Sequence, residues 1–443
     1  MPDELFDMPP RVEPEKPSAN KPPPRLRTAN RKQVELRAMD LEGLLPPDHQ
    51  ARMVWDYVEG LDLSPLYDAI DAVEGGPGHA ATDPKILMAL WLYATLDGVG
   101  AARAVDRMTR EHDAYRWICG GVSVNYHTLS DFRVGHMAFL DGLLTTSVAT
   151  LIAAGLVSMN RVAQDGMRVR ASAGAASFRR KDTLDECLRD AEEQVETLRR
   201  EVDEDPAATS RRQEAARRRA AEDRRRRVAE ALARIPDAEA KKKKADKDKA
   251  RVSTTDPEAT VMKMGDGGFR PAYNAQYATD TESQVIVGVE VVNLGSDQGQ
   301  LAPMIDQLQY RYDRIPDDML VDGGFVNLET IEALASEGCD VYAPVPKPRK
   351  GSKRDRYEPR PDDSPPIASW RQRMGTDEAK AIYKERAPGA ECVNAHARNR
   401  GLHQFLVRGW WKVRSVMLWQ ALAHNMKRAM TLRAAEQAPA LAI

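Results

Sequence analysis

Two Asp-Gly sites, at Asp165 and Asp322, each follow a short apolar run of the sequence. A carboxylate at the end of a strand is where a sheet-based enzyme would present metal ligands. Cleavage of a phosphodiester by two divalent ions needs several such carboxylates, because one ion activates the attacking oxygen and the other stabilises the leaving oxygen. Hard oxygen ligands suit magnesium or manganese. The two sites therefore predict a pair of metal ligands, although Asp-Gly alone is also a common turn signal.

A third carboxylate is available late in the chain, in the run AIYKERAPGAECVNAHARNRG at 381–401. Glu391 and Glu385 are both candidates to complete the pair. Asp256 and Asp266 could also be considered as metal ligands. We interpret these two as loop and cap residues, because the first strands of the expected sheet need a turn where they lie.

The elements before the first Asp-Gly site are predicted to be helical. Residues 1–30 are rich in proline and charged residues. They can bury too little apolar surface to offset the conformational entropy lost on folding, so we expect a disordered tail. Residues 31–158 predict an all-helical domain. Asp83 is a candidate N-cap, with Pro84 in the first turn of the following helix. Further helices are expected at 101–109, 128–139 and 141–154.

Residues 159–431 predict an α/β domain with a mixed sheet and flanking helices. Its first strand, at 161–171, is expected to contain a turn or bulge at Asp165-Gly166. A charged, Ala-rich insertion at 181–250 follows, and Pro206 and Pro236 predict two or three helices rather than one rod. The expected later elements are strands at 273–278, 284–292, 318–321 and 339–345, helices at 297–312, 328–337, 376–400 and 412–431, a loop at 346–370, and a flexible tail at 432–443.

Several motifs together resemble the DDE insertion-sequence transposases, in particular the branch called IS-eleven-eighty-two. A Tyr, an Arg, a Glu and a basic residue recur in that branch, and Tyr383, Arg386, Glu391 and Arg398 match this arrangement. The resemblance covers residues 35–430. Its further motifs are NYHTLSDFR at 125–133, QDGMRVRASAG at 164–174, STTDPEATVMKMGDGGFRPAYNAQYATD at 253–280, RGWWKVR at 408–414 and AHNMKR at 423–428.

The resemblance implies an RNase H-like catalytic domain, preceded by a helical domain at 31–158 that recognises DNA ends. It implies that Asp165, Asp322 and Glu391 hold two Mg²⁺ ions, or Mn²⁺, and that the enzyme cleaves DNA at the ends of its mobile element and transfers the strand into target DNA. Tyr383 and Arg386 would contact DNA phosphates, with Arg398 as a further DNA-binding residue. A packed Tyr and a surface ion pair are the plain alternatives for the first two.

Two departures from the branch stand out. Arg398 stands where the family usually has a Lys. The positive charge is kept, but a phosphate would meet a planar guanidinium with several N–H donors instead of a compact ammonium group. Many relatives also carry a cysteine-rich insertion between the second Asp and the Glu, where this chain has only Cys339. No metal-binding accessory element is therefore expected.

Composition limits the partners. The 443 residues include 65 basic and 67 acidic side chains, so affinity for DNA must come from local basic stripes. The stretch 398–428 is one such stripe, whereas the basic runs of the insertion are interleaved with acids and could equally form a solvated surface. The four cysteines are far apart, no apolar run reaches about 20 residues, and there is no signal peptide, so we expect a cytoplasmic protein without a membrane partner. The resemblance implies that this protein is bacterial and associated with the nucleoid.

The expected partners are the terminal inverted repeats and target DNA, bound by a homodimer or larger assembly in the synaptic complex. Two other functions are compatible with the sequence. One is a non-catalytic DNA-binding repressor derived from a transposase, and the other is a stand-alone RNase H-like nuclease.

Overall fold

The computed structural model describes residues 29–34, 38–72, 75, 79–204, 211–242, 244–348 and 354–437. The chain divides into two compact units, Met1–Asp40 and Leu41–Ile443. The described helices and strands all lie in the second unit. Nearly all of the predicted N-terminal tail and the last six residues of the predicted C-terminal tail fall outside the described residues.

A helical module opens the second unit, as predicted. Helix α3 (Pro84–Leu96) begins where the sequence indicates, because the Asp83 side chain accepts the backbone N–H of Lys85 and Pro84 occupies the first turn. The expected helix at 128–139 is divided at His136 between two helices. The other elements are η1 (Glu42–Leu44), α1 (Gln50–Glu59), α2 (Ser64–Asp68), α4 (Ala102–Glu111), α5 (Asp113–Cys119), α6 (Tyr126–Gly135) and α7 (Met137–Ala153).

The second part of the unit is built on a mixed sheet. Its strands are β1 (Arg161–Arg170), β4 (Thr260–Lys263), β5 (Phe269–Asp280), β6 (Ile286–Val292), β7 (Asp318–Leu320) and β8 (Asp340–Tyr342). The strand order is β4-β5-β1-β7-β8, with β6 also pairing with β5. Strand β7 is parallel to both of its neighbours, β1 and β8, whereas β5 is antiparallel to β1. A helical region followed by a mixed sheet with flanking helices confirms the expected fold class.

Strand β1 is continuous through Asp165 and Gly166, so the turn or bulge expected there is wrong. Each of the two residues has its own partner on β5, Tyr277 and Gln276 respectively. The local Asp-Gly signal is overridden by a long antiparallel ladder, which satisfies the backbone groups on both sides of the pair.

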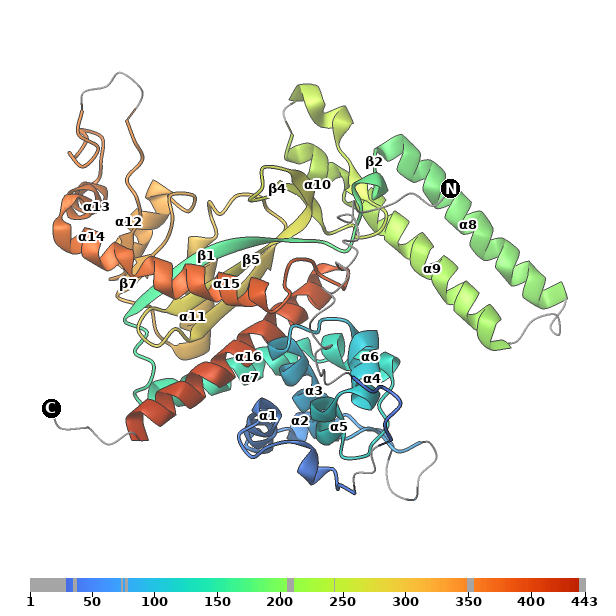
Figure 1. The fold of residues 1–443 in the computed structure, drawn as a ribbon. Coiled ribbons are helices and arrows are strands. Elements are labelled where there is room, and N and C mark those ends of the chain that lie inside the picture. The colour runs from blue at the N-terminus through green and yellow to red at the C-terminus, as the bar shows by residue number, and fades with distance from the viewer. Residues whose placement is uncertain are drawn as a thin grey trace, which may run out of the picture. The chain divides into compact units, whose positions relative to one another are not determined.

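The charged insertion forms a separate helical arm. Helices α8 (Lys181–Glu204) and α9 (Arg211–Ala233) lie side by side as an antiparallel pair (Figure 1). Helix α10 (Ile235–Ala240) and the 3-10 turn η3 (Lys244–Lys249) follow. The short strands β2 (Phe178–Arg179) and β3 (Val252–Ser253) pair at the base of the arm. A small apolar core lies beside this pairing and consists of Leu184, Val228, Ala231, Ile235 and Val252. Helices α8, α9 and α10 confirm the prediction of two or three helices for the insertion.

The remaining helices flank the sheet. Helix α13 (Pro365–Gly375) begins inside the predicted loop at 346–370, because Pro365 and Pro366 fit the first turn of a helix. Helix α16 (Trp410–Gln437) extends beyond its predicted end at 431. The others are α11 (Leu301–Tyr312), α12 (Leu328–Ser336), α14 (Asp377–Lys384), the π-helical turn η4 (Ala387–Glu391) and α15 (Cys392–Asn399). In Figure 1, α16 and α7 lie side by side.

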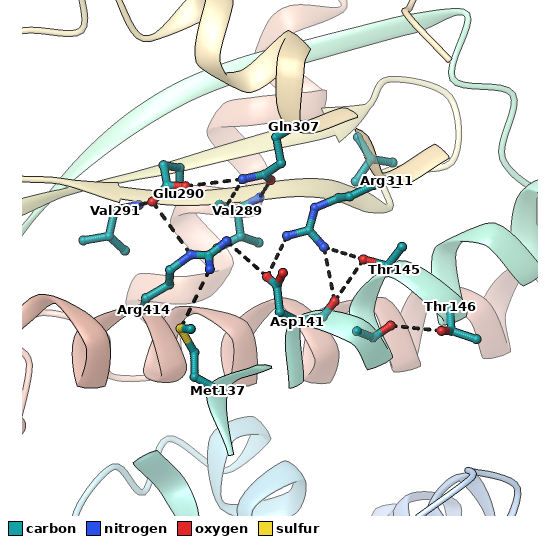
Figure 2. A network of polar contacts seen from close by, with 12 residues as sticks. Met137, Asp141, Thr145, Thr146, Val289, Glu290, Val291, Gln307, Arg311 and Arg414 are labelled. Atoms are coloured by element: carbon teal, nitrogen blue, oxygen red, sulfur yellow. Dashed lines mark hydrogen bonds and ion pairs between the residues drawn. The ribbon is translucent and has the colours of Figure 1, made fainter. Parts of the chain in front are cut away.

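Asp141 on α7 joins the helical module to the sheet (Figure 2). Its Oδ1 accepts from Arg311 Nη2 on α11 at 2.6 Å and from Arg414 Nη2 on α16 at 3.1 Å. Arg311 also donates to Thr145 Oγ1, and Arg414 lies 3.7 Å from the Glu290 carboxylate on β6. A single apolar core also runs through both parts. The module and the sheet are therefore packed as one body.

None of the described helices is by itself long and apolar enough to cross a membrane. Helices α6 and α7 meet that test together, by length and composition only, with a bend of 61° between them.

Candidate active site

Asp165 and Asp322 are brought together by the parallel pairing of β1 with β7. Ala163 on β1 is paired with Leu320 at the end of β7. Asp165 and Asp322 each follow this pair by two residues, and they are close enough for the charge of Asp322 to raise the pKa of Asp165. The Asp322 carboxylate also accepts the backbone N–H of Gly324 at 2.7 Å, which fixes the turn after β7. The two carboxylates therefore occupy one edge of the sheet.

Glu391 reaches the same edge from the π-helical turn η4. The link is Arg386, whose Nη2 donates to Glu391 Oε1 at 2.5 Å and whose Nη1 lies 3.9 Å from Asp165 Oδ1. The guanidinium also lies over the Tyr383 ring, 5.9 Å from its centroid. Asp165, Asp322, Glu391, Tyr383 and Arg386 thus form one group, which we call the carboxylate cluster.

The π-helical turn explains why Arg386 and Glu391 face each other. In an α-helix, residues five apart lie on different faces. In a π-helical turn the hydrogen bonds join residues i and i+5, so two residues five apart come to lie on the same face. The backbone N–H of Cys392 bonds to Ala387 O in this way. Pro388 has no N–H to donate, and its carbonyl accepts from the Gln284 side chain at 3.3 Å. The wider turn was not foreseen from the sequence.

Asn394 is a further residue of the site that the search for carboxylates missed. Its Nδ2 donates to Asp165 Oδ2 at 3.0 Å, and its side chain is buried. Asn394 follows Glu391 by three residues, and residues three apart are neighbours on the surface of a helix. The sequence could therefore have indicated Asn394 as a neighbour of Glu391. Its Oδ1 is buried without a hydrogen-bond partner.

The charges of the cluster are strongly coupled. Burial raises the pKa of Asp165, the Arg386 guanidinium opposes this rise, and the neighbouring Asp322 adds to it. Burial disfavours the charged form of Arg386, but Tyr383 and the three carboxylates outweigh it and raise the pKa of the guanidinium. Burial also raises the pKa of the Tyr383 phenol. The site therefore holds excess negative charge that one arginine only partly balances.

Asp165→Asn should increase thermal stability at neutral pH. The folded-state pKa of Asp165 lies above its unfolded value, so ionisation of this carboxylate opposes folding, and the cost disappears below the unfolded pKa of about 3.9. The gain in unfolding temperature should be present at pH 7 and shrink toward pH 4 in calorimetric scans. Asp266→Asn is the control, because Arg270 lowers the pKa of that exposed carboxyl. If Asp165→Asn were less stable than wild type at pH 7, the conclusion that the ionised Asp165 carboxylate opposes folding would be wrong.

The donor set fits a hard divalent cation. Within the described residues, no three His, Cys, Asp or Glu side chains lie close enough together to hold a metal ion. Arg386 is the cation that contacts Glu391 and approaches Asp165 here. Carboxylate oxygens and the unpartnered Asn394 Oδ1 are nevertheless the ligands that magnesium prefers. Binding of such an ion requires a change in the contacts of Arg386.

The opposite face of β1 supports the cluster through Gly166. A Cβ at this position would lie 2.2 Å from Asp297 Oδ1 and 2.4 Å from Gln276 Nε2. The buried Asp297 carboxylate accepts from Asn274, Gln276 and Arg168. Only glycine leaves room for this network behind Asp165. Asp297 was expected merely to begin a helix.

The other candidate residues lie elsewhere. Glu385 accepts from Arg161 Nη1 at 2.8 Å, at the start of β1 and four residues from Asp165, which is about 13 Å along a strand. Asp256 is buried and accepts from a tyrosine hydroxyl, while Asp266 caps the β4–β5 turn. Arg398 is exposed two helical turns beyond Glu391. Of the two glutamates considered, Glu391 is the one within the carboxylate cluster.

Comparison with known families gives two matches. Residues 236–426 match the Transposase DDE domain family, and residues 39–134 match the Transposase domain (DUF772) family. Comparisons with curated proteins and with solved structures found no match. The first match contains Asp322 and Glu391, whereas Asp165 lies before the insertion and outside both. The chain therefore carries a match to a transposase DDE domain and a match to a second transposase domain, which together indicate a transposase.

Proposed function

We propose that this transposase cleaves DNA at the ends of its own element and joins the freed 3′ hydroxyl to target DNA, as a member of the IS-eleven-eighty-two branch. The observation that carries the proposal is the grouping of Asp165, Asp322 and Glu391 around Arg386 at one sheet edge. DDE transposases use divalent metal ions in general. No covalent bond between protein and DNA is needed.

Each residue of the cluster has a role in this reaction. Asp165, Asp322 and Glu391 would hold two magnesium or manganese ions, which supply activation of the attacking oxygen and stabilisation of the leaving oxygen. Asn394 orients the Asp165 carboxylate through its hydrogen bond. Arg386, released from Glu391, binds a phosphate next to the cleaved bond and is supported by the Tyr383 ring.

DNA outside the cluster is held by other parts of the protein. Arg398 lies on the helix that continues from Glu391, so it contacts the backbone of the same strand. The helical module recognises the terminal inverted repeats. Both ends of the element must be paired for strand transfer, so the reacting form is at least a homodimer, acting in the bacterial cytoplasm at the nucleoid.

A joining assay tests this function. Wild-type protein, a pre-cut duplex carrying the element's terminal repeat, a plasmid target and Mg²⁺ should yield covalently joined DNA, and EDTA should prevent it. A repressor would bind the duplex without producing joined or cleaved DNA. A nuclease would degrade it without joining, and either outcome contradicts the proposal.

A further inference from the structure

The helical arm has an open groove along one side. Helix α8 packs mainly against α9, and the two lie side by side (Figure 1). The groove between them has a volume of about 880 Å³. Its apolar lining consists of Leu188, Val195 and Leu198 from α8 and Ala215, Ala221 and Ala229 from α9. Charged side chains of both helices line it as well, so the groove combines apolar and ionic surface.

The apolar stripe of α8 extends further than the apolar surface that α9 offers to it. The stripe has alternating spacings of four and three residues, which is the repeat of a helix that packs against other helices. It consists of Leu184, Leu188, Ala191, Val195 and Leu198. Near the base of the arm, Leu184 packs with Val228 and Ile235. Toward the tip, the only apolar residues of α9 at 213–220 are alanines, and Leu198 stays half-buried. The outer part of the stripe is therefore only partly covered.

The two helices of the arm carry opposite charge. At 181–201, α8 has twice as many acidic as basic side chains, whereas at 213–233 the basic side chains of α9 outnumber the acidic ones. In the part of the chain that the structure describes, Arg199 and Glu222 form the ion pair that joins the two helices, and the other ion pairs of α9 lie within α9. The acidic side chains at 182–196 form no ion pair among these residues. Most of the opposite charge is therefore not neutralised within one arm.

A second copy of the arm complements this surface. A twofold dimer uses the same surface of both copies, so the surface must carry both members of each complementary pair. When α8 of one copy lies against α9 of the other, carboxylates face guanidinium groups in two symmetric places and the two apolar stripes share one core. Two helical pairs joined in this way form a four-helix bundle. DNA is a poorer fit, because its phosphates would be repelled by the acidic α8.

We propose that the arm is a dimerisation element, in which α8 of one copy packs against α9 of a second copy over the groove. This inference deepens the proposed function, because joining two element ends requires two copies of the active site. The interface lies within the insertion and uses none of the residues of the carboxylate cluster. The dimer should therefore form without DNA and without Mg²⁺.

Charge reversal on each helix tests the proposal. Glu192→Lys/Glu196→Lys makes α8 basic at the groove, and Arg218→Glu/Arg225→Glu makes α9 acidic there. Because like charges then face each other, the dissociation constant of the dimer should rise at least about tenfold in each variant alone. An equimolar mixture of the two variants should restore the dimer, since opposite charges meet again. Sedimentation velocity in low salt, without DNA or metal, measures these constants.

A control reverses two charges of α8 away from the groove. Asp190→Lys/Glu201→Lys changes the charge of the helix by the same amount, at exposed residues outside the groove lining. It should dimerise like wild type. All substituted side chains are exposed, so the helix content measured by circular dichroism should be unchanged. The proposal is overturned if wild type is monomeric, if the groove variants dimerise as well as wild type, or if their mixture does not form a dimer.

The same variants distinguish the arm's role from the catalytic chemistry. If Arg218→Glu/Arg225→Glu remained dimeric but bound an end-containing duplex more weakly than wild type, the arm would contact DNA and the proposal would be wrong. A dimer formed elsewhere on the chain would leave cleavage by the carboxylate cluster possible. Loss of the predicted chemistry at that cluster would in turn leave the sedimentation results standing.

Discussion

Glu391→Gln is expected to reduce magnesium-dependent DNA cleavage by about 10³-fold or more. Charge stabilisation by a bound metal contributes several kcal/mol to such a reaction, and each 1.36 kcal/mol is a factor of ten in rate. The amide keeps the size of the side chain and can still meet Arg386 through its oxygen, so folding should be preserved. Single-turnover cleavage of an end-containing duplex measures the effect.

Glu385→Gln is the matched control, six residues earlier in the same segment. Its carboxylate pairs with Arg161, which retains a second partner in Asp318 at 2.9 Å. Exposed pairs of this kind contribute about 0–1 kcal/mol to stability. Cleavage by this variant should stay close to that of wild type. If only Glu385→Gln lost activity, the third carboxylate would be Glu385 and the cluster described above would be misassigned.

Local signals predicted much of the helical part of the fold. Asp83 and Pro84 mark the start of α3 because capping and the first turn depend on neighbouring residues only. The strand at β1 was equally visible from its alternation, but the expected bulge was wrong. An antiparallel partner more than a hundred residues away, β5, holds Asp165 and Gly166 in the extended ladder. Pairing with such a distant strand cannot be read from a dipeptide.

The candidate site shows the same division between local and distant effects. Asp165 and Asp322 were identifiable because each follows a strand-like run, and Glu391 because of its motif. Asn394 was not, since its role depends on contact with a residue 229 positions earlier. The π-helical turn η4 was also hidden, because it depends on how Pro388 and Gly389 pack against β1 and the β5–β6 turn.

Asp322→Asn is the second change with a large expected effect. The substitution keeps an oxygen for the backbone N–H of Gly324, so the turn after β7 should persist. It removes one of the two carboxylates that the sheet places side by side, and with it a ligand for the divalent ion. We expect a loss of cleavage of about 10³-fold or more, for the same energetic reason as at Glu391. Affinity for the duplex in EDTA should change little.

The most direct test of the carboxylate cluster is therefore a paired measurement on wild type and Asp322→Asn. Cleavage of an end-containing duplex in Mg²⁺ and binding of the same duplex in EDTA are determined on the same preparations. The carboxylate cluster predicts that cleavage is lost while binding is retained. Undiminished cleavage by Asp322→Asn would contradict it.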